Sequence, residues 1–448
     1  MSAHADAIRA RLANGKLSAR QLVENIGVSQ PTLSRALASL GDAVVRIGAG
    51  TSIQYALRDT ARGLPDIPVY RVDAQGQIRR LGILIPVRPE GFVLRREDGV
   101  SRHSDGLPWW LFDMRPQGYL GRTFAARHGG ALGLPERITD WTDTHALRAL
   151  LKEGHDVVGN LLLGDVARAA FLASPEPTTE LAGTEDKAAT YARLAREVAN
   201  GELPGSSAGG EQPKFTATIL TPFGIQHVIV KFTEPEQNPV SERWRDLLLA
   251  EHLALTTLRE AGIPAARTDI IDHAGQRFLE VERFDRIGKL GRRALCSLAA
   301  LDAEFVGLGA GNWSDITRRL AADGHIPANA ADRASLLWAF GVLIANTDMH
   351  NGNLSFIGEG SPHDIAPAYD MTPMAFAPRS GGGLPDSVIE ATIHASIANE
   401  TWRQAATLAQ SFLAKTQTNS EFSPRFQTCI TALKRHIEAA CVKIGRLG

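Results

Sequence analysis

The segment NTDMHNGN, residues 346–353, indicates the fold and the chemistry of this 448-residue chain more clearly than any other stretch. It follows the apolar run LLWAFGVLIA, residues 336–345, which is too short to cross a bilayer, since a spanning helix needs about 20 residues. We therefore expect a buried helix that ends in a polar loop. Asp370 comes seventeen residues after Asn353, in the segment APAYDMTP, residues 366–373.

The residue types in these segments match the tasks of phosphoryl transfer. Asp348 could orient and deprotonate a hydroxyl group, while Asn353 and Asp370 could offer hard oxygen ligands to a Mg²⁺ ion that bridges nucleotide phosphates. His350 lies in the same loop and could orient it, because the aspartate is the better placed base. For the first segment alone, an Asn- and Asp-rich turn that caps a helix remains the alternative.

A lysine ends an apolar strand upstream of these segments. Lys231 closes HVIVKF, residues 227–232, and lysine is rarely buried without a partner. A strand lysine that faces a cleft could hold nucleotide phosphates, whereas an edge lysine would reach solvent. The next predicted helix offers two carboxylates, Glu242 and Glu251, as partners. We favour Glu251 because it interrupts a long apolar run; a solvated glutamate on the helix surface is the alternative.

The segment GSSAGGEQPKF, residues 205–215, is rich in small residues and leads into a predicted strand. Glycines allow backbone N–H groups to approach phosphate oxygens closely, which makes this stretch a candidate phosphate-binding loop. The candidate contacts in it are Ala208, Gly209, Gly210 and Lys214. An ordinary Gly/Ser connection is the alternative. A second glycine-rich stretch, GLGAGN at residues 307–312, follows Lys231 instead of preceding it, so we expect only a surface loop there.

The segment FLEVERFDR, residues 278–286, begins like a strand and ends in charged residues. A two-lobed kinase has its hinge at this place in the chain order. The backbone groups of Glu282, Arg283 and Phe284 could there hydrogen-bond an adenine edge. An ordinary strand that ends in a charged turn is the alternative.

The first 60 residues are predicted to form three helices and a hairpin. After a first helix, a second is expected from about residue 18 to residue 26, Gly27 makes a turn, and Ser29 can cap a third helix that reaches about residue 40. The stretch VVRIGAGTSIQYAL, residues 44–57, indicates two short strands around a Gly-Ala-Gly turn. This order predicts a winged helix-turn-helix.

The charge of this N-terminal segment suits contact with DNA. Residues 1–60 hold seven Lys and Arg against four Asp and Glu, which is the sign that a phosphate backbone attracts. Short polar residues at the start of a helix suit base-edge and phosphate contacts. The candidate DNA contacts on the third helix are Ser29, Gln30, Thr32 and Arg35. A packing or dimerisation module is the alternative.

Composition narrows the class of protein. Hydrophobic residues make up 44% of the chain and charged residues 22%, which excludes a wholly disordered or fibrous protein. The 48 Lys and Arg nearly balance the 49 Asp and Glu, so the whole molecule is not built for unspecific nucleic-acid binding. The three cysteines are too sparse for a disulfide framework, which favours a reducing cytoplasm. No apolar signal-peptide core is visible near the N-terminus, and no membrane partner is expected.

The order of these segments resembles the HipA family of bacterial serine/threonine kinases, the toxins of HipA–HipB toxin–antitoxin pairs. The segments that carry the resemblance are GSSAGGEQPKF, VIVKF, VERFDR, NTDMHNGN and AYDMTP, and it covers roughly residues 66–445. The fused N-terminal segment is similar in architecture to the YjjJ group of HipA-like proteins. The Asp-x-His-x-x-Asn motif also resembles lipid kinases, which share the broader kinase fold.

The resemblance implies an α+β fold with a β-rich kinase N-lobe and a mainly helical C-lobe. The implied division is a winged helix-turn-helix at residues 1–62, a β-rich subdomain at 63–175, the kinase N-lobe region at 176–286 and the helical C-lobe at 287–448. It also implies ATP and Mg²⁺ as cofactors, a protein substrate with a serine or threonine, and an antitoxin of HipB type as a partner.

The resemblance also implies individual roles. By position these are the catalytic base for Asp348, metal ligation for Asn353 and Asp370, and the ATP-phosphate contact for Lys231. In the family, a serine of the Gly-rich loop is autophosphorylated, which ejects the loop and disables ATP binding. Ser207, or failing that Ser206, is the implied serine, and Glu211 stands where a small residue is usual.

Three classes of function are therefore compatible with the sequence. The first is an ATP-dependent serine/threonine protein kinase of toxin type. The second is a transcriptional regulator that binds DNA through residues 1–60 and uses a kinase-like domain only to sense nucleotide. The third is a kinase that acts on the hydroxyl group of a sugar, a lipid or an antibiotic.

Overall fold

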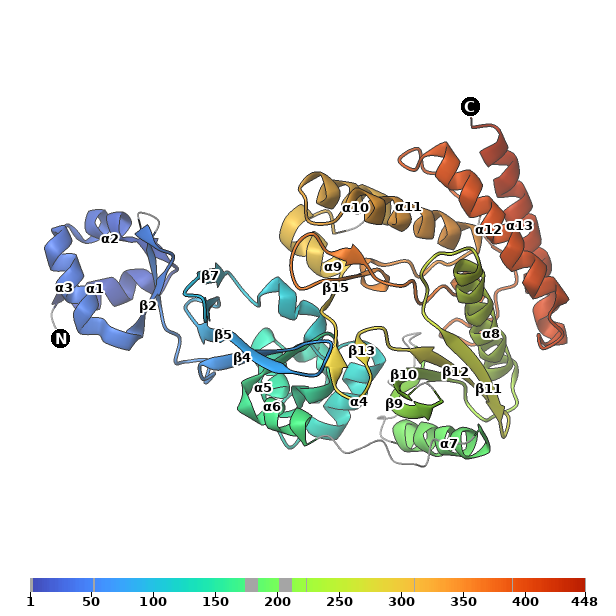
Figure 1. The fold of residues 1–448 in the computed structure, drawn as a ribbon, viewed down its shortest axis with the longest axis horizontal. Coiled ribbons are helices and arrows are strands. Elements are labelled where there is room, and N and C mark those ends of the chain that lie inside the picture. Colours follow the sequence, from blue (N-terminus) through green and yellow to red (C-terminus); the bar gives the residue numbers. More distant parts are fainter. Residues whose placement is uncertain are drawn as a thin grey trace. The chain divides into compact units, whose positions relative to one another are not determined.

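The computed structural model (Figure 1) describes residues 3–50, 53–173, 184–200, 212–222, 224–309, 311–388 and 390–447. The chain divides into two compact units. The N-terminal unit comprises Met1–Asp73, Gln77–Arg115 and His128–Ser174, and the C-terminal unit comprises Ala74–Gly76, Pro116–Arg127 and Pro175–Gly448. The finer division into four domains remains a prediction.

The start of the N-terminal unit contains three helices and three short strands. The helices are α1 (Ala3–Leu12), α2 (Ala19–Ile26) and α3 (Gln30–Leu40), and the strands are β1 (Leu17–Ser18), β2 (Val44–Ile47) and β3 (Gln54–Leu57). The strands form an antiparallel sheet in the order β1-β3-β2. Gly27 ends α2 with φ of 72°, a value that glycine adopts without strain. The predicted second and third helices and the predicted hairpin are confirmed.

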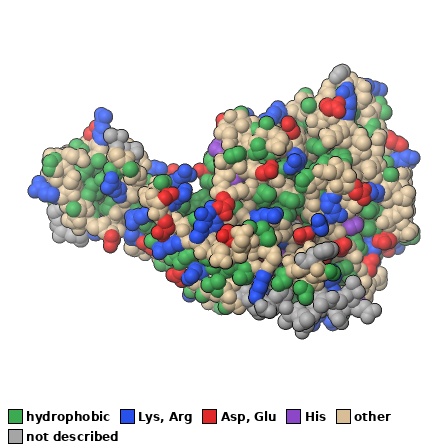
Figure 2. All heavy atoms as spheres, viewed as in Figure 1, with side chains coloured by type: hydrophobic (Ala, Val, Ile, Leu, Met, Phe, Trp, Pro, Cys, Tyr) green, Lys and Arg blue, Asp and Glu red, His purple; other side chains and the backbone are tan. Residues whose placement is uncertain are grey.

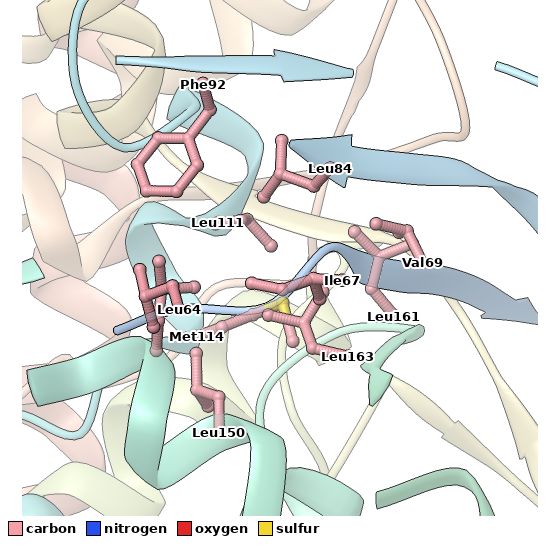
Figure 3. Close-up of a cluster of buried hydrophobic side chains, with 11 residues drawn as sticks. Leu64, Ile67, Val69, Leu84, Phe92, Leu111, Met114, Leu150, Leu161 and Leu163 are labelled. Carbon is pink, nitrogen blue, oxygen red and sulfur yellow. The ribbon is translucent and has the colours of Figure 1, made fainter. Parts of the chain in front are cut away.

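The remainder of the N-terminal unit is built on a five-stranded antiparallel sheet. Its strands are β4 (Ile67–Val72), β5 (Ile78–Pro86), β6 (Phe92–Arg96), β7 (Ser101–Ser104) and β8 (Leu161–Leu163), in the order β7-β6-β5-β4-β8. Helices α5 (Asp143–Glu153) and α6 (Gly164–Leu172) pack near it. Figure 3 shows the apolar cluster between the sheet and α5, with Leu84 and Phe92 of the sheet at one side of the cluster and Leu150 of α5 at the other. Burial of these side chains holds the layers together.

The C-terminal unit contains a four-stranded antiparallel sheet between two helices. The strands are β9 (Lys214–Thr221), β10 (Gly224–Phe232), β11 (Thr268–His273) and β12 (Gln276–Glu282), in the order β11-β12-β10-β9. Helix α7 (Thr184–Asn200) packs on one side of the sheet and α8 (Pro239–Glu260) on the other (Figure 1). Tyr119 of α4 (Gly118–His128) joins the apolar cluster on the α7 side.

Helices dominate the rest of the C-terminal unit. They are α9 (Leu298–Leu301), a π-helical turn (Asp302–Val306), α10 (Trp313–Ala322), α11 (Ala328–Leu343), α12 (Asn399–Thr418) and α13 (Gln427–Gly445). The short strands are β13 (Arg286–Ile287), β14 (Gly291–Arg292), β15 (Leu295–Ser297), β16 (Ser355–Ile357) and β17 (Asp364–Ile365). Most of α11 is buried, which confirms the predicted buried helix before the polar loop.

The surface carries both signs of charge. Figure 2 shows Lys and Arg side chains interspersed with Asp and Glu over the visible face. Among the described residues, no helix is both long and apolar enough to pass through a membrane.

We predict that replacing Phe278 with alanine destabilises the C-terminal unit by about 3–5 kcal/mol, because Phe278 is fully buried between Tyr191 and Phe232. The free energy of unfolding, measured by urea titration, checks this. Leu220→Ala on β9 is the control, since that leucine is 46% exposed and its loss should change stability by less than about 0.5 kcal/mol. Equal effects of the two variants would contradict the packing described here.

Candidate active site

Lys231 is buried on the face of the sheet that α8 covers. Side chains alternate between the two faces of a strand, and Val228, Val230 and Phe232 of β10 pack on the α7 side. Lys231 lies between them in sequence and therefore points to the opposite face. Its cross-strand neighbour Leu279 packs in the cluster on the α8 side. Lys231 is only 7% exposed, so the alternative of an edge lysine in solvent is wrong.

Two carboxylates surround the Lys231 ammonium group. Its Nζ lies 2.6 Å and 2.7 Å from the two carboxylate oxygens of Glu251 on α8, and 2.5 Å from Oδ1 of Asp370. Glu251 is 2% exposed, which confirms it as the partner of the lysine. Glu242 instead lies near Arg425, at 3.6 Å. The contacts of Lys231 thus join β10, α8 and the segment around residue 370.

The ion pairs of this cluster shift the pKa values of Lys231 and Asp370. Burial alone would lower the pKa of Lys231, but the charges of Asp370 and Glu251 outweigh it and raise the pKa above its ordinary value. Burial alone would raise the pKa of Asp370, but the charges of Lys231 and Lys214 hold it below its ordinary value. His350 lies close enough to Asp370 to act in the same direction. The two pKa shifts keep Lys231 protonated and Asp370 ionised near neutral pH.

The polar loop begins where α11 ends, and a buried asparagine shapes it. Ala345 adopts φ of 59°, which turns the chain sharply out of the helix. Asn346 then accepts a hydrogen bond from the Asp348 N–H at 3.0 Å and donates one from Nδ2 to the backbone oxygen of Asp370 at 3.1 Å. One side chain therefore ties the Asp348 loop to the Asp370 segment. Asp348 itself is exposed.

Two further bonds fix the interior of this loop. His350 Nδ1 accepts a hydrogen bond from the Gly352 N–H at 3.0 Å, so this histidine orients the loop as expected. Asn353 is buried and donates from Nδ2 to the backbone oxygen of Asp348 at 2.7 Å. The oxygen of its amide is therefore the end that a cation could take.

The Asp370 segment is held in an unusual backbone conformation. Asp370 has φ of 53°, a region that residues with a side chain rarely adopt and that often accompanies function. Thr372 donates a hydrogen bond to Glu251 at 2.9 Å, and the Tyr369 hydroxyl donates one to the Gly352 oxygen at 2.8 Å. Residues on both sides of Asp370, one and two positions away, thus bind parts of the same site, which offsets the cost of the strained residue.

The predicted hinge comprises the last residue of β12 and the two residues after it, and its Phe284 lies beside the Asp370 segment. The Arg283 N–H donates to the backbone oxygen of His227 on β10 at 2.9 Å. The Phe284 ring lies 5.8 Å from the Tyr369 ring, measured between centroids. Glu282 ends the strand, and its N–H donates to the Arg267 oxygen at 2.9 Å. The hinge therefore contacts Tyr369, the residue next to Asp370.

Of the candidate contacts in the glycine-rich loop, only Lys214 lies among the described residues. Lys214 opens β9, lies opposite Lys231 in the sheet register and influences Asp370. The other predicted positions, which are Ser206, Ser207, Ala208, Gly209 and Gly210, lie outside the described residues. Their roles as phosphate contacts and as autophosphorylation sites remain predictions.

The described residues fit a magnesium ion that is shared with phosphates. In the part of the chain that the structure describes, no three His, Cys, Asp or Glu side chains gather into a metal-binding group. Mg²⁺ needs only one or two carboxylates when phosphate oxygens and water complete its shell. The carboxylate of Asp370 and the amide oxygen of Asn353 have the donor chemistry that such a set requires.

The candidate DNA contacts lie together at the start of α3. Ser29 caps the helix, accepting a hydrogen bond from the Thr32 N–H at 3.4 Å, which confirms the predicted cap. Arg35 donates to the Thr32 hydroxyl at 3.5 Å. Ser29, Gln30 and Arg35 are exposed and Thr32 is partly buried, so the four form one polar surface.

Sequence reasoning missed three residues of the site. Asn346 and Thr372 were quoted within their segments but received no role, and Tyr369 was likewise passed over. A buried asparagine directly after an apolar helix was a usable signal for Asn346, because such a side chain must find backbone partners. The bonds of Thr372 and Tyr369 join segments far apart in the chain, and nothing local indicates them.

Comparisons with known proteins cover both units. Family models match residues 64–172 as a YjjJ-like toxin middle domain and residues 206–441 as a HipA-like C-terminal domain. Toxin YjjJ of Escherichia coli (strain K12) is 37% identical over 439 residues, which is 98% of each chain.

Solved structures share the fold at low sequence identity. A chain of the Shewanella oneidensis MR-1 complex of HipA, HipB and operator DNA matches with a TM-score of 0.50 at 15% identity, over 84% of this chain and 97% of that one. The Helicobacter pylori proinflammatory kinase CtkA matches with a TM-score of 0.39 at 13% identity, over 55% of this chain and 97% of that one. The first supports a likeness of fold, and the second is too distant to support an argument.

We predict that Glu251→Gln lowers the free energy of unfolding by about 3 kcal/mol, because it removes one charge from a buried pair. Glu242→Gln is the matched control on the same helix. Its carboxylate is 30% exposed and its pair with Arg425 is long, so the loss should stay below about 1 kcal/mol. Urea unfolding of both variants checks this, and a cost for Glu242→Gln as large as that for Glu251→Gln would contradict the assigned pairing.

Proposed function

Because this chain belongs to the family of HipA-like toxins, we propose that it is an ATP- and Mg²⁺-dependent serine/threonine protein kinase. One observation carries the proposal: Lys231 of the sheet, Glu251 of α8 and Asp370 form one ion-pair cluster, and Asn346 ties it to the loop of Asp348. A phosphate-binding cation and a hydroxyl-orienting carboxylate are thereby held in one site. Phosphoryl transfer depends mainly on such positioning and on charge neutralisation.

Each residue of the site has a task in this proposal. Lys231 binds the nucleotide phosphates, and Glu251 holds its ammonium group in place. The N–H groups of Glu282 and Arg283 already donate to the Arg267 and His227 oxygens, so the carbonyl oxygens of this stretch and the Phe284 backbone bind the adenine edge. Asp370 and Asn353 would hold a magnesium ion, which neutralises charge on the phosphates when bound. Lys214 adds positive charge on the same side of the site.

Asp348 acts on the acceptor hydroxyl group. It accepts the proton of a serine or threonine hydroxyl while that oxygen forms a bond to the γ-phosphorus and the bond from γ-phosphorus to the bridging oxygen of ADP breaks. The exposed position of Asp348 suits a substrate as large as a protein. His350 and Asn353 keep the loop in shape through their bonds to Gly352 and to the Asp348 backbone.

Regulation and partners follow the family in this proposal. Ser207, or failing that Ser206, is the proposed autophosphorylation site. A HipB-like antitoxin is a proposed partner, since the solved relative is a complex of HipA with HipB and operator DNA. The N-terminal segment, a proposed winged helix-turn-helix, adds a DNA contact that this chain would carry itself. The exposed polar start of α3 supports that contact.

We predict that Asp348→Asn reduces phosphate transfer from labelled ATP by about 10²- to 10⁴-fold, because the acceptor hydroxyl loses its base. Phosphosite mapping by mass spectrometry after incubation with ATP and Mg²⁺ gives the measurement, on the protein itself and on lysate proteins. Asp364→Asn is the control, since Asp364 is exposed on β17 and bonds only its neighbour Ile365 among the contacts described. Undiminished transfer by Asp348→Asn would remove this residue from the mechanism.

Phosphate transfer, together with DNA binding and ATP consumption by the wild-type protein, distinguishes the kinase from the other two functions. If the wild-type protein transfers no phosphate but retains salt-sensitive DNA binding, the regulator is the correct assignment. Consumption of ATP only in the presence of a metabolite would favour the small-molecule kinase.

We predict that Arg35→Ala weakens binding to operator-like DNA and reduces the salt slope of the affinity by about one, because one phosphate contact is lost. Gel-shift titrations at several salt concentrations check this. Arg20→Ala on α2 is the matched control, because Arg20 is exposed and already paired with Glu24 at 2.8 Å. Unchanged affinity for the Arg35 variant would show that this helix does not touch DNA.

A further inference from the structure

The glycine-rich stretch at residues 307–312, expected from the sequence to be only a surface loop, starts from a buried acid. The π-helical turn Asp302–Val306 precedes it, and single π turns are frequent at functional sites. Asp302, the first residue of this turn, is 3% exposed. A buried carboxylate needs hydrogen-bond donors, so its partners show which part of the chain it organises.

The partners of Asp302 are three consecutive backbone amides of the loop. The Gly307 N–H donates to its backbone oxygen at 2.6 Å. The Leu308 and Gly309 N–H groups donate to its two carboxylate oxygens at 3.0 Å and 2.7 Å. Hydrogen bonds to a charged acceptor are about twice as strong as neutral ones. Gly307 and Gly309 adopt φ of 76° and 66°, which only glycine does easily, so the carboxylate fixes a defined turn.

The fixed turn makes direct contact with the Asp348 loop. The carbonyl oxygen of Gly309 accepts a hydrogen bond from Nδ2 of Asn351 at 3.2 Å. Asn351 is the first residue of the 3₁₀ turn Asn351–Asn353, and the last residue of this turn binds the Asp348 backbone. A chain of hydrogen bonds therefore runs from buried Asp302 through Gly309 and Asn351 to the loop of the proposed base.

The other end of the stretch is anchored as well. Asn312 caps α10 by accepting from the Asp315 N–H at 3.0 Å, and its Nδ2 donates to the Ser396 hydroxyl at 3.2 Å. Ser396 belongs to the segment that follows Asp370 and leads to α12. The stretch is thus bound at one end to the Asp348 loop and at the other to the segment downstream of Asp370.

We propose that Asp302 and Asn351 are positioning residues, which hold the Asp348 loop through the Gly309 carbonyl in the conformation that meets the acceptor hydroxyl. This inference rests on the proposed kinase function. Neither residue touches a reacting group, so both act on the rate of transfer and not on nucleotide binding. The Asn351 bond holds the loop at a second point besides the bonds of Asn346, and the two together fix its orientation.

The test combines kinetics with hydrogen exchange on the full-length protein. For Asn351→Ala and Asp302→Asn, we expect the saturating rate of phosphate transfer from labelled ATP to fall on the order of tenfold to a hundredfold, since small misplacements of a catalytic group have such effects. The KM for ATP should change less than about twofold, because Lys231 and Glu251 keep their contacts. Amide exchange of residues 348–353 without nucleotide should become faster in both variants.

Two controls and a double variant distinguish coupling from general loss of stability. Asp246→Asn changes a comparable buried carboxylate, because Asp246 accepts from the N–H and the hydroxyl of Ser423 at 2.9 Å and 2.6 Å. Asn419→Ala removes a similar turn asparagine, which accepts from Glu421 at 2.8 Å. Neither should accelerate exchange at residues 348–353. Because Asp302 and Asn351 act through one chain, the double variant should be no slower than the slower single variant.

The outcomes are separable from those of the kinase proposal. Unchanged exchange at residues 348–353 in Asn351→Ala overturns the positioning role, as does a rise in KM for ATP without loss of the saturating rate. A double variant whose rate of transfer falls by the product of the two single effects also overturns the positioning role. Accelerated exchange in a protein whose wild type transfers no phosphate supports the link between the loops and refutes the kinase function instead.

Discussion

The buried ammonium group of Lys231 is the constraint on which the site depends. A lysine at 7% exposure costs several kcal/mol in lost hydration unless opposite charges compensate it. Glu251 and Asp370 provide that compensation from a helix and from a segment more than a hundred residues downstream. The sheet, α8 and the Asp370 segment are therefore obliged to meet at one point. The strained backbone of Asp370 is one visible consequence, since the pairing with Lys231 and the bond from Asn346 hold it there.

Local rules were sufficient for much of the fold and for the main charged residues of the site. The Ser29 cap, the turn at Gly27 and the buried helix before residue 346 each follow from a few neighbouring residues. The strand pattern around Lys231 left open whether the lysine faces the interior or solvent, and its 7% exposure decides for the interior. Glu251 was favoured over Glu242 because it interrupts an apolar run, and its 2% exposure confirms that argument.

The remaining parts of the site depend on contacts that sequence spacing does not encode. Thr372 binds Glu251 across 121 positions, and Asn351 binds Gly309 across 42. The glycine stretch at residues 307–312 is predicted to be a surface loop, and Gly307 and Gly309 are exposed. The spacing does not show that the buried acid five residues earlier binds the loop amides. Tertiary hydrogen bonds to backbone groups carry no residue-type signature, and this limits prediction at such sites.

The direct contact between Lys231 and Asp370 has a thermodynamic consequence. A phosphate oxygen that drew the ammonium group away would leave the carboxylate of Asp370 with uncompensated negative charge, and a divalent cation would restore neutrality. Binding of the nucleotide phosphate would thereby raise the affinity of the protein for the cation, and binding of the cation would raise its affinity for the nucleotide. By linkage, the factor must be the same in both directions. Nucleotide and cation are then expected to enter cooperatively, without any movement of the lobes to transmit the effect.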